Sequence, residues 1–117
     1  MRCMRRLEAV AQDQVRFCRM EFYLNVRRSG GQVLVAACDK EVLGKTFSSG
    51  KLCLEVSRTF YCRELVGIKE LLAALSDASI ANLAGNNVVS AAVAGGFIDE
   101  KNVLDIGGVK HAQFVVL

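Results

Sequence analysis

The chain has 117 residues, of which 52% are hydrophobic, and a formal net charge of +3. This length and apolar content predict one folded domain with a single core and exclude a disordered chain. The longest apolar run, residues 88–98, is interrupted and shorter than the roughly 20 residues that cross a bilayer, so we expect no membrane partner. Charged and polar residues stand where a signal peptide would be apolar, and we expect a cytoplasmic protein.

The positive charge is concentrated at the N-terminus. Residues 1–19 hold five arginines against two acidic side chains, whereas residues 20–117 hold ten basic and ten acidic side chains. Residues 7–18 have the apolar spacing of a short amphipathic helix. The segment either binds phosphates or lies upstream of a natural start at Met20. We therefore predict a basic extension over 1–19 and a single α+β domain over 20–117.

The first half of this domain has the pattern of strands. Residues 22–27 alternate between apolar and polar, residues 32–38 are apolar on both faces, and two glycines separate them, which predicts a β-hairpin. Asp39 is expected to cap a short helical turn over 40–45. Residues 51–57 alternate again and predict a third strand.

The second half has the pattern of helices followed by two strands. Leucine and isoleucine form one stripe over 65–75, residues 77–85 suggest a second short turn, and a third helix runs from 86 or 87 to 94. The last strands are expected at 102–106 and 112–117, joined through "GGVKH". This order predicts an α+β fold: a mostly antiparallel sheet of about five strands with two to three helices packed on one face.

Neither the cysteines nor the Gly-Lys-Thr motif at 44–46 predicts a known site. The five cysteines include no Cys-x-x-Cys pair, so we expect no structural zinc. Cys38 and Cys53 lie within apolar runs, and we expect them to be small buried hydrophobic residues. A phosphate-binding loop needs a glycine where Asp39 stands. We expect no cofactor here, with Leu43 and Phe47 facing the core and Lys45 in solvent.

The run "SRTFYCR" interleaves aromatic and basic side chains. Such a pattern suits single-stranded nucleic acid, because bases stack on rings while guanidinium groups bind phosphates. The candidate contacts are Arg58, Tyr61 and Arg63, with Lys45 extending the patch. The alternative is a strand-to-helix connection with Phe60 buried and Tyr61 half exposed.

Two further segments offer polar groups without a catalytic motif. In "ANLAGNN", amides such as Asn82 at a helix start either bind a polar ligand or cap the helix. His111 is the single histidine, and neither a nucleophile motif nor a set of metal ligands accompanies it. It is either structural or a hydrogen-bond or stacking group beside free N–H groups of Gly107 and Gly108.

The motifs "LGKTF", "ANLAG" and "IGGVKHAQ" together resemble an archaeal family of uncharacterised proteins, domain of unknown function 424, over roughly residues 20–115. The resemblance implies an archaeal cytoplasmic source, one α+β domain, no assigned activity and a loose association with translation genes. It transfers no catalytic residues.

We therefore expect a non-enzymatic binding module that acts on RNA or a ribonucleoprotein and needs no cofactor. The expected contacts are Lys45, Arg58, Tyr61, Arg63, Asn82, Gly107, Gly108 and His111. One alternative is a protein-interaction module or homodimer that pairs the terminal strand "FVVL" across a sheet edge. Another is a small enzyme or ligand-binding protein with a pocket near His111.

Overall fold

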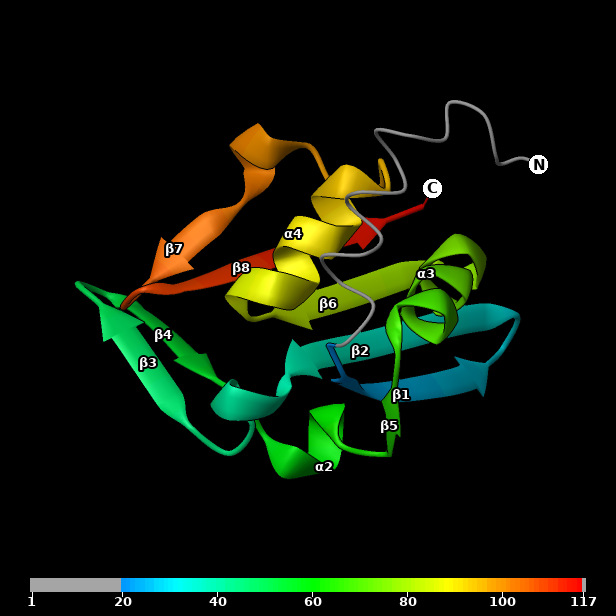
Figure 1. The fold of residues 1–117 in the computed structure, drawn as a ribbon, viewed down its shortest axis with the longest axis horizontal. Helices are drawn as coiled ribbons and strands as arrows, with labels where there is room; N and C mark the ends of the chain where they lie inside the picture. The colour runs from blue at the N-terminus through cyan, green and yellow to red at the C-terminus, as the bar shows by residue number, and fades with distance from the viewer. Residues whose placement is uncertain (1–19, 117) are drawn as a thin grey trace.

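The computed structural model describes residues 20–116, which form a six-stranded sheet with two helices on one face (Figure 1). The predicted extension over 1–19 lies outside these residues. The strand order is β5-β1-β2-β6-β8-β7, in which β2 and β6 are parallel and all other neighbours are antiparallel. The strands are β1 (Phe22–Ser29), β2 (Gln32–Asp39), β5 (Glu64–Val66), β6 (Ile80–Ala84), β7 (Leu104–Ile106) and β8 (Val109–Val115).

The remaining elements are a small hairpin and several helices. The hairpin forms a separate two-stranded sheet. The two longer helices, α3 and α4, each follow an inner or edge strand of the main sheet and return the chain across it (Figure 1). These elements are β3 (Thr46–Ser49), β4 (Leu52–Glu55), η1 (Lys40–Val42), α2 (Arg58–Tyr61), α3 (Ile68–Asp77), α4 (Asn86–Ala94) and η2 (Glu100–Asn102).

The main core lies between the sheet and the two longer helices, as predicted. Phe22 and Leu83 from the sheet meet Leu71 of α3 and Val88 of α4, and all four side chains are fully buried. Burying one such side chain contributes about 1.5–3 kcal/mol. The core therefore fixes α3 and α4 on the same face of the sheet and leaves the other face to different partners.

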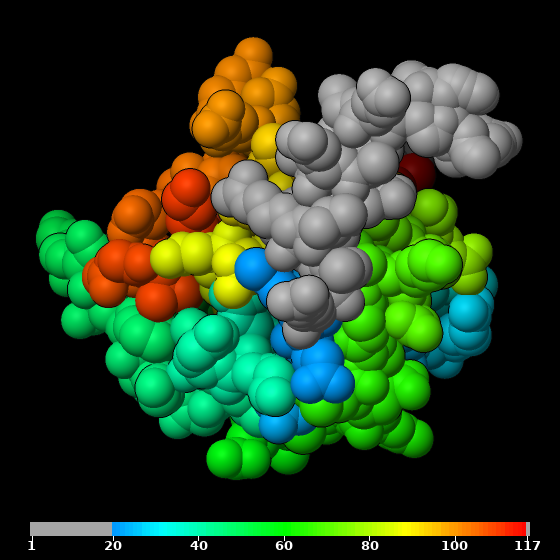
Figure 2. Space-filling view, in the orientation of Figure 1, coloured from blue at the N-terminus to red at the C-terminus, as the bar shows by residue number. Residues whose placement is uncertain are grey.

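The opposite face of the sheet is covered only at one end. The β3–β4 hairpin and α2 pack there against Cys38 and Ala84, and they bury Leu54, Val56 and Tyr61 with them. The hairpin also lies against the β7–β8 turn at that end of the molecule (Figures 1 and 2). A Cβ added to Gly107 in this turn would lie 2.8 Å from the Ser48 carbonyl oxygen, so the two backbones approach closely.

The prediction for residues 77–85 is wrong, because Ile80–Ala84 is the strand β6 at the centre of the sheet. A short interior strand is apolar on both faces and has no period that distinguishes it from a helical turn. The main sheet consequently has six strands rather than about five, and it contains the parallel pair β2–β6.

Other boundaries also differ from the prediction. Residues 52–55 form β4 in the separate hairpin, not a strand of the main sheet, and Leu65 belongs to β5 rather than to the helix. The turn before β8 needs only Gly107 and Gly108, whose φ angles of 62° and 89° suit a tight hairpin turn. Strand β8 therefore begins at Val109 and lies inside the sheet between β6 and β7.

The cysteines among the described residues differ in their exposure to solvent. Cys38 is fully buried, as predicted, and burial raises the pKa of its thiol to about 12. Cys53 is exposed, so its prediction as a buried residue is wrong, because its side chain lies on the outer face of β4. Over residues 20–116, no helix is long and apolar enough to cross a bilayer, and no three His, Cys, Asp or Glu side chains are grouped to hold a metal.

Candidate binding face of the sheet

The face of the sheet that points away from α3 and α4 is the candidate site, and we call it the open face. Alternation along each strand places one set of side chains in the helix-covered core and the next set on the opposite side. Beyond the end covered by α2 and the β3–β4 hairpin, side chains on the open face are half-buried or exposed. This part of the open face carries Arg27, Leu34, Ile80, Asn82, His111, Gln113 and Val115.

A row of amides crosses the open face. Strand pairing sets Asn25, Ala36, Asn82 and Gln113 side by side on β1, β2, β6 and β8. Alternate residues of β8 bond to β6, as shown by the N–H of Val116 donating to the Ser79 carbonyl at 2.7 Å. The Asn82–Gln113 pair is therefore non-hydrogen-bonded along the backbone, the arrangement that brings opposite side chains closest.

The amides on β6 and β8 have no partner among residues 20–116, and the buried amide on β1 is half-satisfied. Neither side-chain amide of Asn82 or Gln113 has a hydrogen-bond partner within the described part of the chain. Asn25 is only 3% exposed; its Nδ2 donates to the Phe60 carbonyl at 2.9 Å, and its Oδ1 has no partner there. Buried polar atoms are normally paired, so the Asn25 acceptor marks this row as unusual.

Asn25 and Arg27 together hold α2 against the sheet. The Arg27 guanidinium donates to the Thr59 carbonyl at 3.0 Å and lies 5.8 Å from the centre of the Phe60 ring. A four-residue helix such as α2 leaves its last carbonyls unpaired, and these two side chains of β1 satisfy two of them. The basic and aromatic segment is therefore fixed at one border of the open face.

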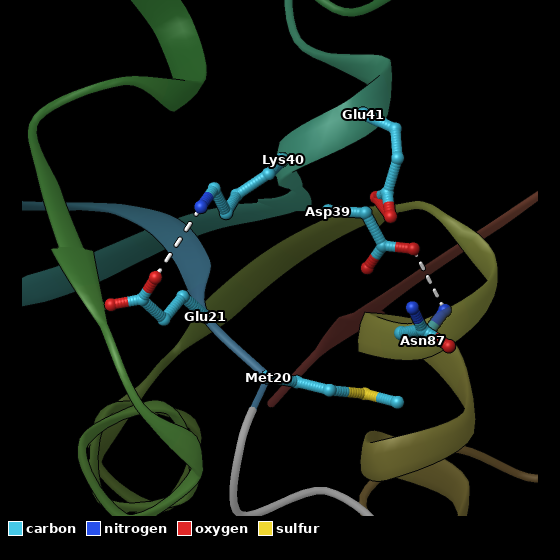
Figure 3. Close-up of a pocket in the computed structure, with 6 residues that line it drawn as sticks. All are labelled: Met20, Glu21, Asp39, Lys40, Glu41 and Asn87. Atoms are coloured by element: carbon cyan, nitrogen blue, oxygen red, sulfur yellow. Dashed lines mark hydrogen bonds and ion pairs between the residues drawn. The ribbon is translucent and has the colours of Figure 1, made fainter.

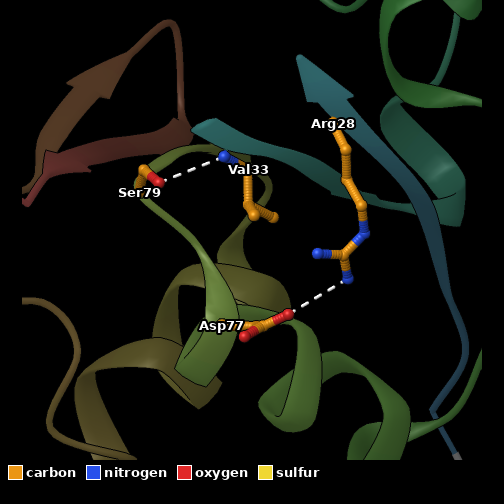
Figure 4. Close-up of polar contacts among 4 residues, drawn as sticks. All are labelled: Arg28, Val33, Asp77 and Ser79. Carbon is orange, nitrogen blue, oxygen red and sulfur yellow. Dashed lines mark hydrogen bonds and ion pairs between the residues drawn. The ribbon is translucent and has the colours of Figure 1, made fainter. Parts of the chain in front are cut away.

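The cations predicted from sequence gather partly at this border. The Arg58 side chain packs on Gly44: its Nε would lie 3.4 Å from a Cβ added at that glycine. Arg58 therefore lies beside the loop that contains Gly44 and Lys45. Arg63 is exposed just after α2. Arg28, one residue after Arg27, faces the other side and pairs with Asp77 at 3.0 Å (Figure 4).

Carboxylates are absent from the open-face positions of the four central described strands β1, β2, β6 and β8. In these strands the only acidic side chain is Asp39, at the end of β2 and on the side of α4. The charged group that the open face does carry is Arg27. The face is therefore weakly positive although the domain as a whole is neutral.

Tyr61 is not part of this surface. It is 4% exposed, and burial raises the pKa of its hydroxyl to about 12, with a smaller contribution from Cys38. The predicted exposure of the two rings is wrong, because Phe60 is half-buried at the border while Tyr61 fills the core beneath α2. The ring available there is the one of Phe60, which contacts Tyr61 edge to face.

His111 and Asn82 lie close together, whereas the glycines do not join them. His111 stands opposite Ala84 on β6, which makes it a diagonal neighbour of Asn82 on the same face. Burial lowers the pKa of the half-buried imidazole, so the ring is neutral near pH 7. The N–H of Gly108 is not free, because it donates to Asp105 Oδ1 at 2.9 Å.

The start of α4 is also not free to bind a ligand. The Asp39 carboxylate accepts from the N–H groups of Asn87 and Val88 at 2.9 and 2.8 Å, so Asp39 caps α4 and not the turn over 40–45. A shallow depression of about 190 Å³ lies beside it (Figure 3). Its acidic lining is opposed by Lys40, which pairs with Glu21 at 3.3 Å.

Sequence reasoning identified Asn82 and His111 but placed Asn82 at a helix start, and it missed Asn25 and Gln113. The signal for both missed residues was their alternation with apolar neighbours, which puts an amide on the outer face of a strand. Their convergence depends on the position of β6, which was predicted as a turn.

Comparisons with known proteins return uncharacterised relatives. Residues 27–117 match the family model described as "Protein of unknown function (DUF424)". The fold is similar to the crystal structure of an uncharacterized conserved protein from Methanopyrus kandleri, with a TM-score of 0.69 and 25% identity over 83% of this chain and 92% of that chain. No curated protein matches the chain. Neither likeness names an activity.

Proposed function

We propose that this chain, which belongs to the family of proteins of unknown function DUF424, is a non-enzymatic module that binds RNA on its open face. The observation that carries the proposal is the distribution of charge. Arg27 lies on a face whose central described strands place no carboxylate on that side. Helix α2 at its border carries Arg58, which packs on Gly44, the residue before Lys45. A polyanion gains from such a surface even when the net charge of the domain is zero.

The chemistry of the face suits binding rather than reaction. Amides and a neutral imidazole donate and accept hydrogen bonds, and a guanidinium pairs with phosphate. Among the described open-face side chains, no hydroxyl or thiol nucleophile stands beside His111. The groups present can hold and orient a nucleic acid.

Filter binding to archaeal transfer and ribosomal RNA across a salt series tests the proposal. The matched pair of variants is Arg27→Gln on the open face and Arg28→Gln on the opposite face. We expect weaker binding for the first, with a salt slope smaller by about 0.7, and no change for the second. Lys45→Gln provides a second variant that leaves α2 anchored, with Lys69→Gln on α3 as its control. Absence of binding at low salt, or equal effects within each pair, refutes the proposal.

The second candidate is a protein-interaction module, and one observation favours it. Leu34, Ile80 and Val115 form an apolar row at the far end of the open face, where Val115 is 51% exposed. Exposed apolar rows of this kind occur where proteins associate. Light scattering over a range of protein concentrations tests it: a mass that rises with concentration supports self-association, and a constant monomer excludes it.

A further inference from the structure

Resting on the proposed function, we infer that the open face takes single-stranded RNA and reads base edges with the Asn82 and Gln113 amides, instead of holding a duplex by its phosphates. The structural basis is the juxtaposition of the Asn82 and Gln113 amides directly across β6 and β8, where neither side chain has a hydrogen-bond partner among residues 20–116.

The shape of the surface favours a single strand. Asn82 and Gln113 are short side chains on the face of a sheet, and Asn82 is half-buried. An A-form duplex has a deep, narrow major groove that side chains cannot read, and its shallow minor groove is recognised mostly by shape and by contacts to 2′-hydroxyls and phosphates. Bases of a single strand can lie flat against the strands and expose their pairing edges to the amides.

The hydrogen-bonding capacity of the row matches base edges. Each free amide offers a carbonyl acceptor and an NH₂ donor, and such groups bind a base in a bidentate manner. Asn25 stands in the same register row but is buried beneath α2, where its Nδ2 donates to the Phe60 carbonyl, so it supports α2 and does not face a ligand. Asn82 and Gln113 therefore present unmet donors and acceptors on the accessible part of the open face.

The neighbours of the row supply stacking and charge. The neutral His111 ring is diagonal to Asn82 and provides a surface on which a base can stack. Arg27, on β1, lies at the other side of the row. An extended peptide would also match the amides, but no carboxylate occupies an open-face position of the central described strands, and this absence together with the cations of β1 and α2 favours an anionic chain.

Fluorescence anisotropy with labelled oligonucleotides tests the inference. The probes are single strands of U, A and C about 12 nucleotides long, a length within the range that one domain covers, together with an RNA duplex of the same length. The variants are Gln113→Glu, which adds a carboxylate at an exposed strand position, and Asn82→Ala. Asn102→Asp on η2, also exposed, is the matched control. Circular dichroism of every variant verifies that the fold is retained.

We expect single strands to bind more tightly than the duplex. Gln113→Glu and Asn82→Ala should each weaken single-strand binding by about tenfold or more, the effect of losing a bidentate base contact, whereas the control should not change it. If the duplex binds equally well, or if folded variants retain full affinity for single strands, the inference is overturned while RNA binding itself stands. If no RNA binds at low salt, the proposed function fails as well.

Discussion

Replacing Asp39 with alanine removes the acceptor for two main-chain N–H groups at the start of α4. The carboxylate is 5% exposed and accepts from Asn87 and Val88 at 2.9 and 2.8 Å. It comes from the end of β2, so it also joins the sheet to the helix that follows β6. The substitution therefore leaves two donors unpaired in a region that solvent reaches poorly.

The expected loss of stability follows from these contacts. A buried donor left without its partner costs about 1–3 kcal/mol, so two of them cost about 2–6 kcal/mol. Burial of the charge offsets part of this loss, because desolvation raises the pKa of Asp39 even though both N–H groups lower it. We expect Asp39→Ala to reduce the free energy of unfolding by about 2–4 kcal/mol and Asp39→Asn, which keeps one acceptor, by about 1–2 kcal/mol.

Urea denaturation followed by far-ultraviolet circular dichroism measures both variants, with Asp77→Ala as the control. Asp77 pairs with Arg28 in a salt bridge whose side chains are 62% and 66% exposed. Such a pair contributes less than about 1 kcal/mol, so the control should remain near the wild type. An Asp39→Ala variant as stable as the control would refute the reasoning.

The same carboxyl group gives a pH dependence of known sign. Its pKa in the folded state is raised above 3.8, so folding favours the protonated form. The stability that it contributes is therefore complete below pH 3.8 and declines as the pH rises through the raised value. The stability difference between wild type and Asp39→Asn should shrink over that rise, and a difference that grows would contradict the assignment.

Three further outcomes are expected. Gly85→Ala should destabilise the fold more than Gly108→Ala, as a comparison of urea midpoints would show. The angle φ is positive at both glycines, but a Cβ at Gly85 would lie 2.5 Å from the buried Asp39 carboxyl carbon, whereas a Cβ at Gly108 would meet open space. Stability should fall as the pH drops from 6.5 through the lowered pKa of His111, and His111→Gln should remove that part of the fall in a titration of unfolding free energy. Iodoacetamide should modify the exposed Cys53 in the native state and spare Cys38, whose buried thiol has a pKa of about 12; mass spectrometry of both sites provides the measurement, and equal labelling would contradict the burial.

Local signals in the sequence predicted the elements that depend on neighbouring residues. The β1–β2 hairpin follows from an alternating run and a wholly apolar run on the two sides of a two-glycine turn, and α4 follows from an apolar run that ends at Gly95. The placement of both longer helices on one face also followed from the order of the elements. These features need no knowledge of distant contacts.

The features that were missed depend on residues far apart in the chain. Asp39 looks like the cap of the turn that follows it, but its partners Asn87 and Val88 are 48 and 49 positions away. Strand β6 is recognisable only through its pairing with β2 and β8, because its apolar residues face both ways. Since Asn82 lies on β6, the candidate site could not be assembled before that strand was placed.

The parallel pairing of β2 with β6 has a consequence for folding kinetics. The β1–β2 hairpin and the β6–α4–β8 unit each form from nearby residues, but the two join only after the segment 40–79 has closed into a loop. The entropy of closing a flexible loop rises by only about 0.6 kcal/mol when its length doubles. Residues inserted at the tip of the β3–β4 hairpin should therefore slow the joining of the two halves slightly and leave the completed sheet unchanged.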